Sequence, residues 1–477
     1  MRRLVTCSLV LALVLATRAS AQPLRTGFHD PDTFRGPASE RAFSRARSAG
    51  SSVVRIALHW YTVASERPAD ADDPDDPAYA WDAIDRQVTN AVQARLEPIL
   101  GVSSAPPWAR GAAVGLRGSW PSPTRYAEFA RAAARRYSGS FTPADGNNPL
   151  PRVKYWQAWN EPNASRFLNP QRVNGRPVSP AHYRKMVNAF ADAVHGVARS
   201  NRVVAGTTGP FGHDSPDIQV VAPLVFMSDL LCVSMQPPHR KTCSQRTRFD
   251  IWAHNPYSNG GPNRHAYSPA DVSIGDLPEM RSLLVAAKRR GTVTSSGTPE
   301  FWVNEISWET KPPDPRGVPA ALQARWVSEA LYRMWTAGVS SVVWWRLQDD
   351  PLRTSPYQSG VFTAAGKAKL SLTALRFPFV AFRGDTGVTV WGRTPWGDRA
   401  TVVVQRRAGG RWVSVARLRT DRYGIFSKRL PPAAVATATT ALRAQLAGQR
   451  QYSLPFSLTI PPPYQTTAFG CGGIIRC

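Results

Sequence analysis

Short apolar runs alternate with amphipathic stretches from about residue 24 to residue 383. The runs have the length and β-branched content of buried strands, whereas the stretches between them repeat apolar residues at helical spacing. Strands are expected at Thr26–His29, Ser52–Trp60, Glu97–Val102, Val153–Trp159, Arg202–Gly206, Phe249–His254, Phe301–Ile306 and Ser341–Trp345. Helices are expected between them, including Leu277–Arg290 and Ala320–Ala337.

This series of βα units predicts an α/β fold in which a parallel sheet closes into a (β/α)8 TIM barrel. The alternative is an open, doubly wound sheet, but no strand is followed by the Gly-rich phosphate turn typical of that fold. Catalytic groups of such barrels lie at the carboxyl ends of the strands. Functional residues are therefore expected there.

The pattern changes after residue 383, where short alternating segments are separated by turns such as Arg407–Gly410. This spacing predicts a small C-terminal β-sandwich. We therefore expect a catalytic barrel at 22–383, a sandwich at 384–463 and a Cys-containing tail at 464–477. The abrupt change of pattern predicts that a chain ending near Phe382 folds. Because the sandwich holds no cluster of catalytic residue types, such a chain is also expected to retain some activity.

Residues 1–21 have the pattern of a secretory signal peptide. Arg2 and Arg3 precede an apolar run at Leu9–Ala16, and Ala19-Ser20-Ala21 offers a small-residue cleavage site. That run is shorter than the roughly 20 residues that span a bilayer, and no later segment is apolar enough to cross a membrane. The sequence thus predicts a secreted protein that begins at Gln22 and has no membrane span.

Export makes the cysteines candidates for disulfides. Removal of Cys7 with the signal leaves four, whose proximity in sequence suggests the pairs Cys232–Cys243 and Cys471–Cys477. Four cysteines nevertheless allow three pairings. A zinc site is poorly supported because neither pair has the short C-x₂-C spacing. No metal and no cofactor are expected.

The formal net charge of +26 restricts the partners. Such a charge is compatible with nucleic acid, with an anionic cell-envelope polymer, or with an Arg-rich background. Nucleic acid is not expected, because no tight basic run is interleaved with base-stacking aromatic residues. An anionic envelope polymer stays open as a partner.

Two glutamates stand where the barrel would place catalytic groups. Glu161, in the segment WQAWNEPN, follows the fourth strand, although an ordinary strand-end turn has a similar composition. Glu305, in FWVNEISWET, lies inside an apolar strand, where an unpaired carboxylate is costly to bury. A structural ion pair with one of the many arginines is the alternative for Glu305. If both face one cleft, they match the carboxylate pair that glycoside hydrolysis requires.

With these motifs the chain resembles the clan A glycoside hydrolases, and is most similar to family 39 and the cellulase-like family 5. The resemblance implies a retaining enzyme acting on an oligo- or polysaccharide, with Glu161 as acid/base and Glu305 as nucleophile. It also implies that Asn160 contacts the sugar 2-hydroxyl and that Arg55 supports the nucleophile.

The resemblance further implies substrate contacts from His254 and Tyr257, which follow the sixth strand three residues apart instead of the two common in the clan. It also implies that a tryptophan of the eighth strand forms a platform for a sugar ring, and Trp344 is expected in this role in preference to Trp345. Tryptophans at or beyond strand ends are expected to stack on sugar rings: Trp108, Trp308 and Trp344.

A second interpretation is a non-catalytic carbohydrate-binding or envelope-associated protein built on the same barrel. The presence of both glutamates favours the enzyme. The motifs define neither the sugar nor the linkage.

Overall fold

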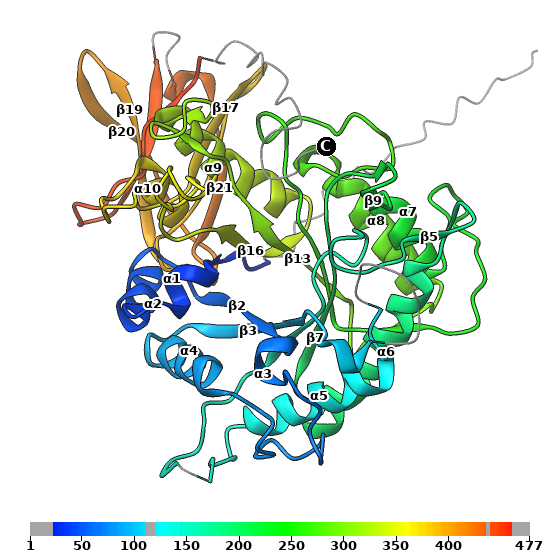
Figure 1. Cartoon of the computed structure of the whole chain (residues 1–477). Coiled ribbons are helices and arrows are strands. Elements are labelled where there is room, and N and C mark those ends of the chain that lie inside the picture. Colours follow the sequence, from blue (N-terminus) through cyan, green and yellow to red (C-terminus); the bar gives the residue numbers. More distant parts are fainter. Residues whose placement is uncertain (1–21, 111–119, 145, 436–438, 460–477) are drawn as a thin grey trace, which may run out of the picture.

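A closed barrel of parallel strands forms the centre of the protein (Figure 1). The computed structural model describes residues 22–459 except 111–119, 145 and 436–438. The barrel strands are β1 (Arg25–His29), β2 (Val53–His59), β3 (Glu97–Ser103), β4 (Tyr155–Ala158), β7 (Arg202–Thr208), β11 (Ile251–His254), β13 (Glu300–Ile306) and β16 (Val339–Trp345). Each overlaps an expected strand, which confirms the (β/α)8 barrel.

Helices cover the outside of the barrel. They are α1 (Pro31–Arg35), α2 (Ser39–Ser48), α3 (Trp60–Val63), α4 (Asp82–Gln93), α5 (Pro123–Arg136), α6 (Ser179–Val197), α7 (Pro223–Leu231), α8 (Leu277–Arg289), α9 (Ala320–Thr336) and α10 (Leu370–Arg376). Within the described residues, none of them is long and apolar enough to cross a membrane.

Short elements lie in the connections. They are β5 (Arg172–Val173), β6 (Arg176–Pro177), β8 (His213–Asp214), β9 (Gln219–Val220), β10 (Thr247–Arg248), β12 (Val293–Thr294), β14 (Thr310–Lys311), β15 (Val318–Pro319), and the 3-10 turns η1 (Pro107–Ala109), η2 (Ile274–Asp276) and η3 (Pro432–Ala434).

Strand alternation decides which side chains enter the barrel, because successive residues of a strand point to opposite faces. In β2, Val53 belongs to the core inside the barrel, whereas Val54 and Ile56 belong to the core between barrel and helices. Arg55 therefore points inward. The same rule directs Gln157 of β4 into the barrel, above the interior layer of apolar side chains.

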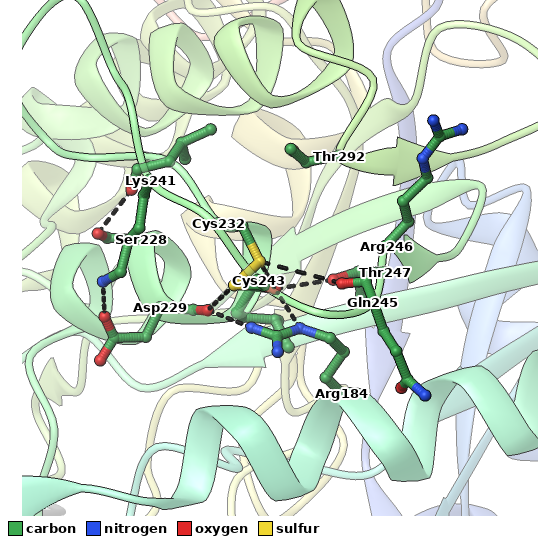
Figure 2. Close-up of a disulfide and its surroundings, with 12 residues drawn as sticks. Arg184, Ser228, Asp229, Cys232, Lys241, Cys243, Gln245, Arg246, Thr247 and Thr292 are labelled. Carbon is green, nitrogen blue, oxygen red and sulfur yellow. Dashed lines mark hydrogen bonds and ion pairs between the residues drawn. A yellow bond between two sulfur atoms is a disulfide. The ribbon is translucent and has the colours of Figure 1, made fainter.

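A disulfide joins Cys232, at the end of α7, to Cys243, with their Cα atoms 5.7 Å apart. Figure 2 shows the pair beside Arg184, whose Nε donates from α6 to the Leu230 carbonyl oxygen at 2.9 Å. This pairing confirms the one expected from sequence proximity. The expected signal peptide, and the tail with Cys471 and Cys477, lie outside the described residues.

The C-terminal unit contains two antiparallel sheets, compatible with the expected β-sandwich. One sheet contains β17 (Phe379–Gly384), β18 (Gly387–Arg393) and β21 (Ile425–Leu430); the other contains β20 (Arg411–Arg419), β19 (Thr401–Ala408), β22 (Ala441–Leu446) and β23 (Phe456–Ser457). The unit begins at Phe379, before the expected boundary at residue 384, because β17 pairs with β18 along its whole length. The expected boundary was too late because an apolar run in the sequence does not reveal whether its strand pairs with the barrel or with the sandwich.

The sandwich packs on α9, as Figure 1 shows. Trp391 of β18 is fully buried, and its ring centre lies 5.5 Å from that of Tyr332 and 5.7 Å from that of Trp335. The ring of Phe382 is likewise 5.5 Å from Tyr332. Apolar surface of the barrel domain is thus covered by the sandwich.

A buried arginine adds polar contacts to the same interface. Arg393 donates from Nη1 to the carbonyl oxygen of Leu24 at 2.9 Å and from Nη2 to Thr26 Oγ1 at 3.1 Å. Thr26 lies in β1, so the sandwich also anchors the first barrel strand. These contacts argue against the expectation that a chain ending near Phe382 folds.

We predict that Trp391→Ala lowers the free energy of unfolding by about 3–5 kcal/mol, because it opens a cavity in this interface. Calorimetry should find one unfolding transition at a lower temperature. The control is Val413→Ala, at an exposed position of β20, which should change stability by less than about 0.5 kcal/mol. Separate transitions, with the barrel's melting temperature unchanged, would contradict this coupling.

Candidate active site

Several expected site residues meet at the carboxyl ends of the barrel strands. Hydrogen bonds and charge join the residues of this group: Arg55, Asn160, Glu161, Tyr257 and Glu305.

The guanidinium of Arg55 links three strands. Its Nη1 donates to Glu305 Oε1, and its Nη2 donates to Asn160 Oδ1 at 2.7 Å. Only 4% of Arg55 is exposed. A buried charge is tolerated when it is paired and hydrogen-bonded, and Glu305 and Asn160 provide both. Arg55 thereby fixes the orientation of both partners.

Both carboxylate oxygens of Glu305 accept hydrogen bonds, because Arg55 contacts one oxygen and Tyr257 contacts the other. The Tyr257 hydroxyl donates to Glu305 Oε2 at 3.2 Å. Burial and the negative charge of Glu305 raise the pKa of Tyr257 well above its ordinary value, so the phenol stays protonated and donates. Glu305 is therefore held at two points.

A bulge in β13 turns Glu305 into the barrel mouth. Val303 pairs with Val342 and Ile306 with Trp344, so three residues of β13 span two of β16. Regular alternation would point Glu305 outward with Val303, which packs in the outer core. An extra residue in one strand re-aims the side chains that follow it, and here it turns Glu305 toward Arg55.

The backbone that leads to Glu161 is irregular as well. Trp159 and Glu161 have φ values of 69° and 39°, in the left-handed region that L-residues seldom occupy. The Glu161 amide donates to the Thr207 carbonyl oxygen at 3.0 Å. Asn163 Oδ1 accepts from the Gly209 amide at 2.8 Å. These bonds to the end of β7 and to the residue that follows it stabilise the strained turn.

Glu161 is partly buried. Asn255 Nδ2 donates to its Oε1 at 3.0 Å, and a Cβ at Gly209 would lie 3.4 Å from its Cδ. Burial, followed by the negative charge of Glu305, raises the pKa of Glu161 to about 7. At that pKa the group both donates and accepts protons near neutral pH.

His254 does not face the mouth, contrary to expectation. Its ring nitrogens lie 2.8 Å from Thr208 Oγ1 and 3.0 Å from the Val272 carbonyl oxygen, and the side chain is fully buried. Burial lowers its pKa to about 4. It shares the outward side of β11 with Trp252, whereas the next residue, Asn255, reaches Glu161.

The expected platform, Trp344, is also on the wrong side of its strand. Val343 belongs to the interior core, so its neighbour Trp344 points outward, with 2% exposed and its Nε1 donating to the Ser359 carbonyl oxygen at 2.8 Å. Trp345 points inward and is partly exposed. Its ring centre lies 5.1 Å from that of His29. The residue available as a platform is therefore Trp345.

The other two tryptophans are held by the protein. Trp308 is buried, donates from Nε1 to the Gly260 carbonyl oxygen at 3.0 Å and packs on Trp326, so it is a core residue. Trp108 is partly exposed, and its Nε1 donates to the Ala64 carbonyl oxygen at 3.0 Å. Its contact with sugar stays a prediction.

His29, which ends β1 on the inward side, is a further residue at the mouth that was not expected from the sequence. Its Nδ1 lies 3.0 Å from the carbonyl oxygen of Arg55. Burial and the charge of Arg55 lower its pKa well below the ordinary value, so the ring is neutral. The sequence carries no clear signal for His29, Asn255 or Trp345, because strands buried on both faces show no apolar–polar alternation. Among the described residues, no group of three or more His, Cys, Asp or Glu could hold a metal ion.

No protein-family model matches the sequence, and no curated protein matches it. Among solved structures, the chain is similar to a family 39 glycoside hydrolase from Bacteroides cellulosilyticus WH2, with 15% identity over 86% of this chain and 81% of that one and a TM-score of 0.55. At this identity the likeness establishes the fold alone.

Two further structures overlap the chain at lower scores. A GH5_18 protein from Streptomyces cattleya has 15% identity over 75% and 79% of the two chains, with a TM-score of 0.49. A monomeric beta-xylosidase from Caulobacter crescentus CB15 has 14% identity over 86% and 93%, with a TM-score of 0.48.

We predict that Glu305→Gln lowers the pKa of Glu161 from about 7, because the neighbouring negative charge disappears while burial remains. The carboxyl carbon of Glu161, assigned by its loss in Glu161→Gln, can be titrated by ¹³C NMR. An unchanged or higher pKa in Glu305→Gln would contradict electrostatic coupling of the two groups.

Proposed function

We propose that this protein is a secreted glycoside hydrolase that cleaves O-glycosidic bonds of an oligo- or polysaccharide with retention of anomeric configuration. The observation that carries the proposal is the pair formed by Glu305 and Glu161 at one barrel mouth. Glu305 is oriented by Arg55 and Tyr257, whereas Glu161 is desolvated, with its pKa raised to about 7. Such divergent environments suit a nucleophile and an acid/base.

In the first step, protonated Glu161 gives its proton to the glycosidic oxygen as the bond to the anomeric carbon breaks. A carboxylate oxygen of Glu305 bonds to that carbon, which yields a glycosyl ester and a free alcohol. Negative charge on Glu305 falls as the ester forms, and this lowers the pKa of Glu161 for its next role.

In the second step, Glu161 removes a proton from water, and the water oxygen attacks the anomeric carbon. The bond to Glu305 breaks, so the sugar leaves and both carboxyl groups return to their starting states. Arg55 and Asn160 are positioning residues in this scheme, and Trp345 supplies a ring face at the mouth.

Export is part of the proposal. The Cys232–Cys243 disulfide supports it, because disulfides persist mainly in oxidising compartments. The mature N-terminus is proposed to be Gln22, which N-terminal sequencing of protein recovered from the medium would test. Association with an anionic envelope polymer stays a prediction from the net charge of +26.

Variants of the two glutamates test the enzyme against the non-catalytic alternative. On aryl glycosides that the wild type cleaves, Glu305→Ala should abolish turnover. Glu161→Ala should slow substrates with poor leaving groups by about 10²–10⁴-fold. For dinitrophenyl glycosides, the first step should proceed in Glu161→Ala as in the wild type. Added azide should increase the turnover rate of this variant.

The matched control is Glu300→Gln at the other end of β13, where Glu300 pairs with Arg25 and Arg202. Its kcat should stay close to that of the wild type. Absence of turnover of any glycoside by the wild type, together with saccharide binding, would instead favour a carbohydrate-binding protein.

A further inference from the structure

A cavity of about 300 Å³ lies beside the turn that carries Glu161. Its wall comes from the end of β3 and from the segments that follow β2, β3 and β4. It includes Tyr61, Ser103, Ser104, Arg110, Trp159 and Arg166. Pockets that bind small ligands start at about this volume. Among the described residues that line it there is no carboxylate.

Two arginines at this cavity lack an acidic partner within the described parts of the chain. Arg166 is exposed, and its guanidinium carbon lies 5.6 Å from the centre of the Phe167 ring. Arg110 donates from Nε and Nη2 to one carbonyl oxygen, that of Ala105, at 3.3 Å each. No hydrogen bond joins its Nη1 to another of the described residues. By contrast, Arg136 elsewhere in the barrel is bound by two aspartates.

The cavity adjoins the reaction site. Trp159 and Arg166 belong to the same connection as Glu161, and the positive charge of Arg166 acts to lower the pKa of both Glu161 and Tyr357. The ring of Tyr357 packs edge-on against Trp345 at the barrel mouth, 5.6 Å between centres. A saccharide cleaved at Glu161 could therefore extend past Arg166.

We propose that this cavity is a subsite for a sugar that carries a negatively charged group, either the carboxylate of a uronic acid or a sulfate ester. Arg166 and Arg110 bind the anion, since a guanidinium matches the geometry of such oxygens with parallel hydrogen bonds. The hydroxyl groups of Ser103, Ser104 and Tyr61 meet the hydroxyl groups of the sugar. The inference rests on the proposed function, because it takes the ligand to be a saccharide.

Occupancy of the subsite also affects the acid/base. An anion bound to Arg166 offsets the positive charge that lowers the pKa of Glu161. The other groups that act on Glu161, namely Glu305, Arg55 and the Asn255 amide, stay unchanged. An acidic substrate therefore keeps Glu161 protonated to higher pH than a neutral substrate does.

Calorimetric titration of full-length Glu305→Gln with trisaccharides tests the proposal without turnover. The probes are a trigalacturonate, a sulfated galactan trisaccharide and neutral xylotriose. At least one acidic probe should bind tighter than xylotriose, and the stronger of the two identifies the anion. Adding Arg166→Gln or Arg110→Gln to Glu305→Gln should weaken the binding of that acidic probe by at least about tenfold. The affinity for xylotriose should stay unchanged.

The control for net charge is Arg176→Gln, an exposed arginine on the same connection that does not line the cavity. It should leave all affinities unchanged. The subsite is overturned if Arg176→Gln and Arg166→Gln lose the same affinity for the acidic probe. It is also overturned if acidic and neutral probes bind with equal affinity, or if neither acidic probe binds. Tight acidic binding without turnover by the wild type would contradict the proposed hydrolase and leave the subsite intact.

Discussion

The buried guanidinium of Arg55 is the interaction on which the rest of the site depends. With 4% of the residue exposed, its charge must be balanced by partners within the protein. Glu305 supplies the opposite charge and Asn160 supplies a further acceptor. A neutral side chain at position 55 would leave Glu305 without its cation and Asn160 without its anchor. One side chain on β2 thus orients two groups that come from β13 and from the end of β4.

Regular strands alone would not bring the two glutamates together. A bulge in β13 turns Glu305 inward. Left-handed backbone at Trp159 and Glu161 forms the turn that carries the second carboxyl group, on which the charge of Glu305 acts. Such departures from regular geometry cost free energy and persist where surrounding contacts hold them. The bonds between Asn163 and Gly209 provide that support beside Glu161. Strain concentrated at both glutamates is typical of a functional site.

The barrel was predictable because each of its strands is a short apolar run between amphipathic helices. The placement of Glu161 and Glu305 at the barrel mouth was predictable, because Glu161 follows the fourth strand and Glu305 interrupts an apolar strand where an unpaired carboxylate is costly to bury. Their catalytic roles stay predictions. The errors have a common cause. Strands buried on both faces show no apolar–polar alternation, so the sequence does not reveal which of two adjacent residues points inward. Asn255 was therefore missed beside His254, and Trp345 was passed over for Trp344.

The stereochemistry of the first product distinguishes direct attack by Glu305 from attack by water. Proton NMR can follow hydrolysis of a single-anomer aryl glycoside by the wild type and identify the anomer that forms before mutarotation. Retaining enzymes hold their carboxyl groups about 5–5.5 Å apart, which leaves no room for water beneath the anomeric carbon. The roles proposed for Glu161 and Glu305 predict a first-formed product with the configuration of the substrate. A product of opposite configuration would contradict the assignment of Glu305 as the nucleophile.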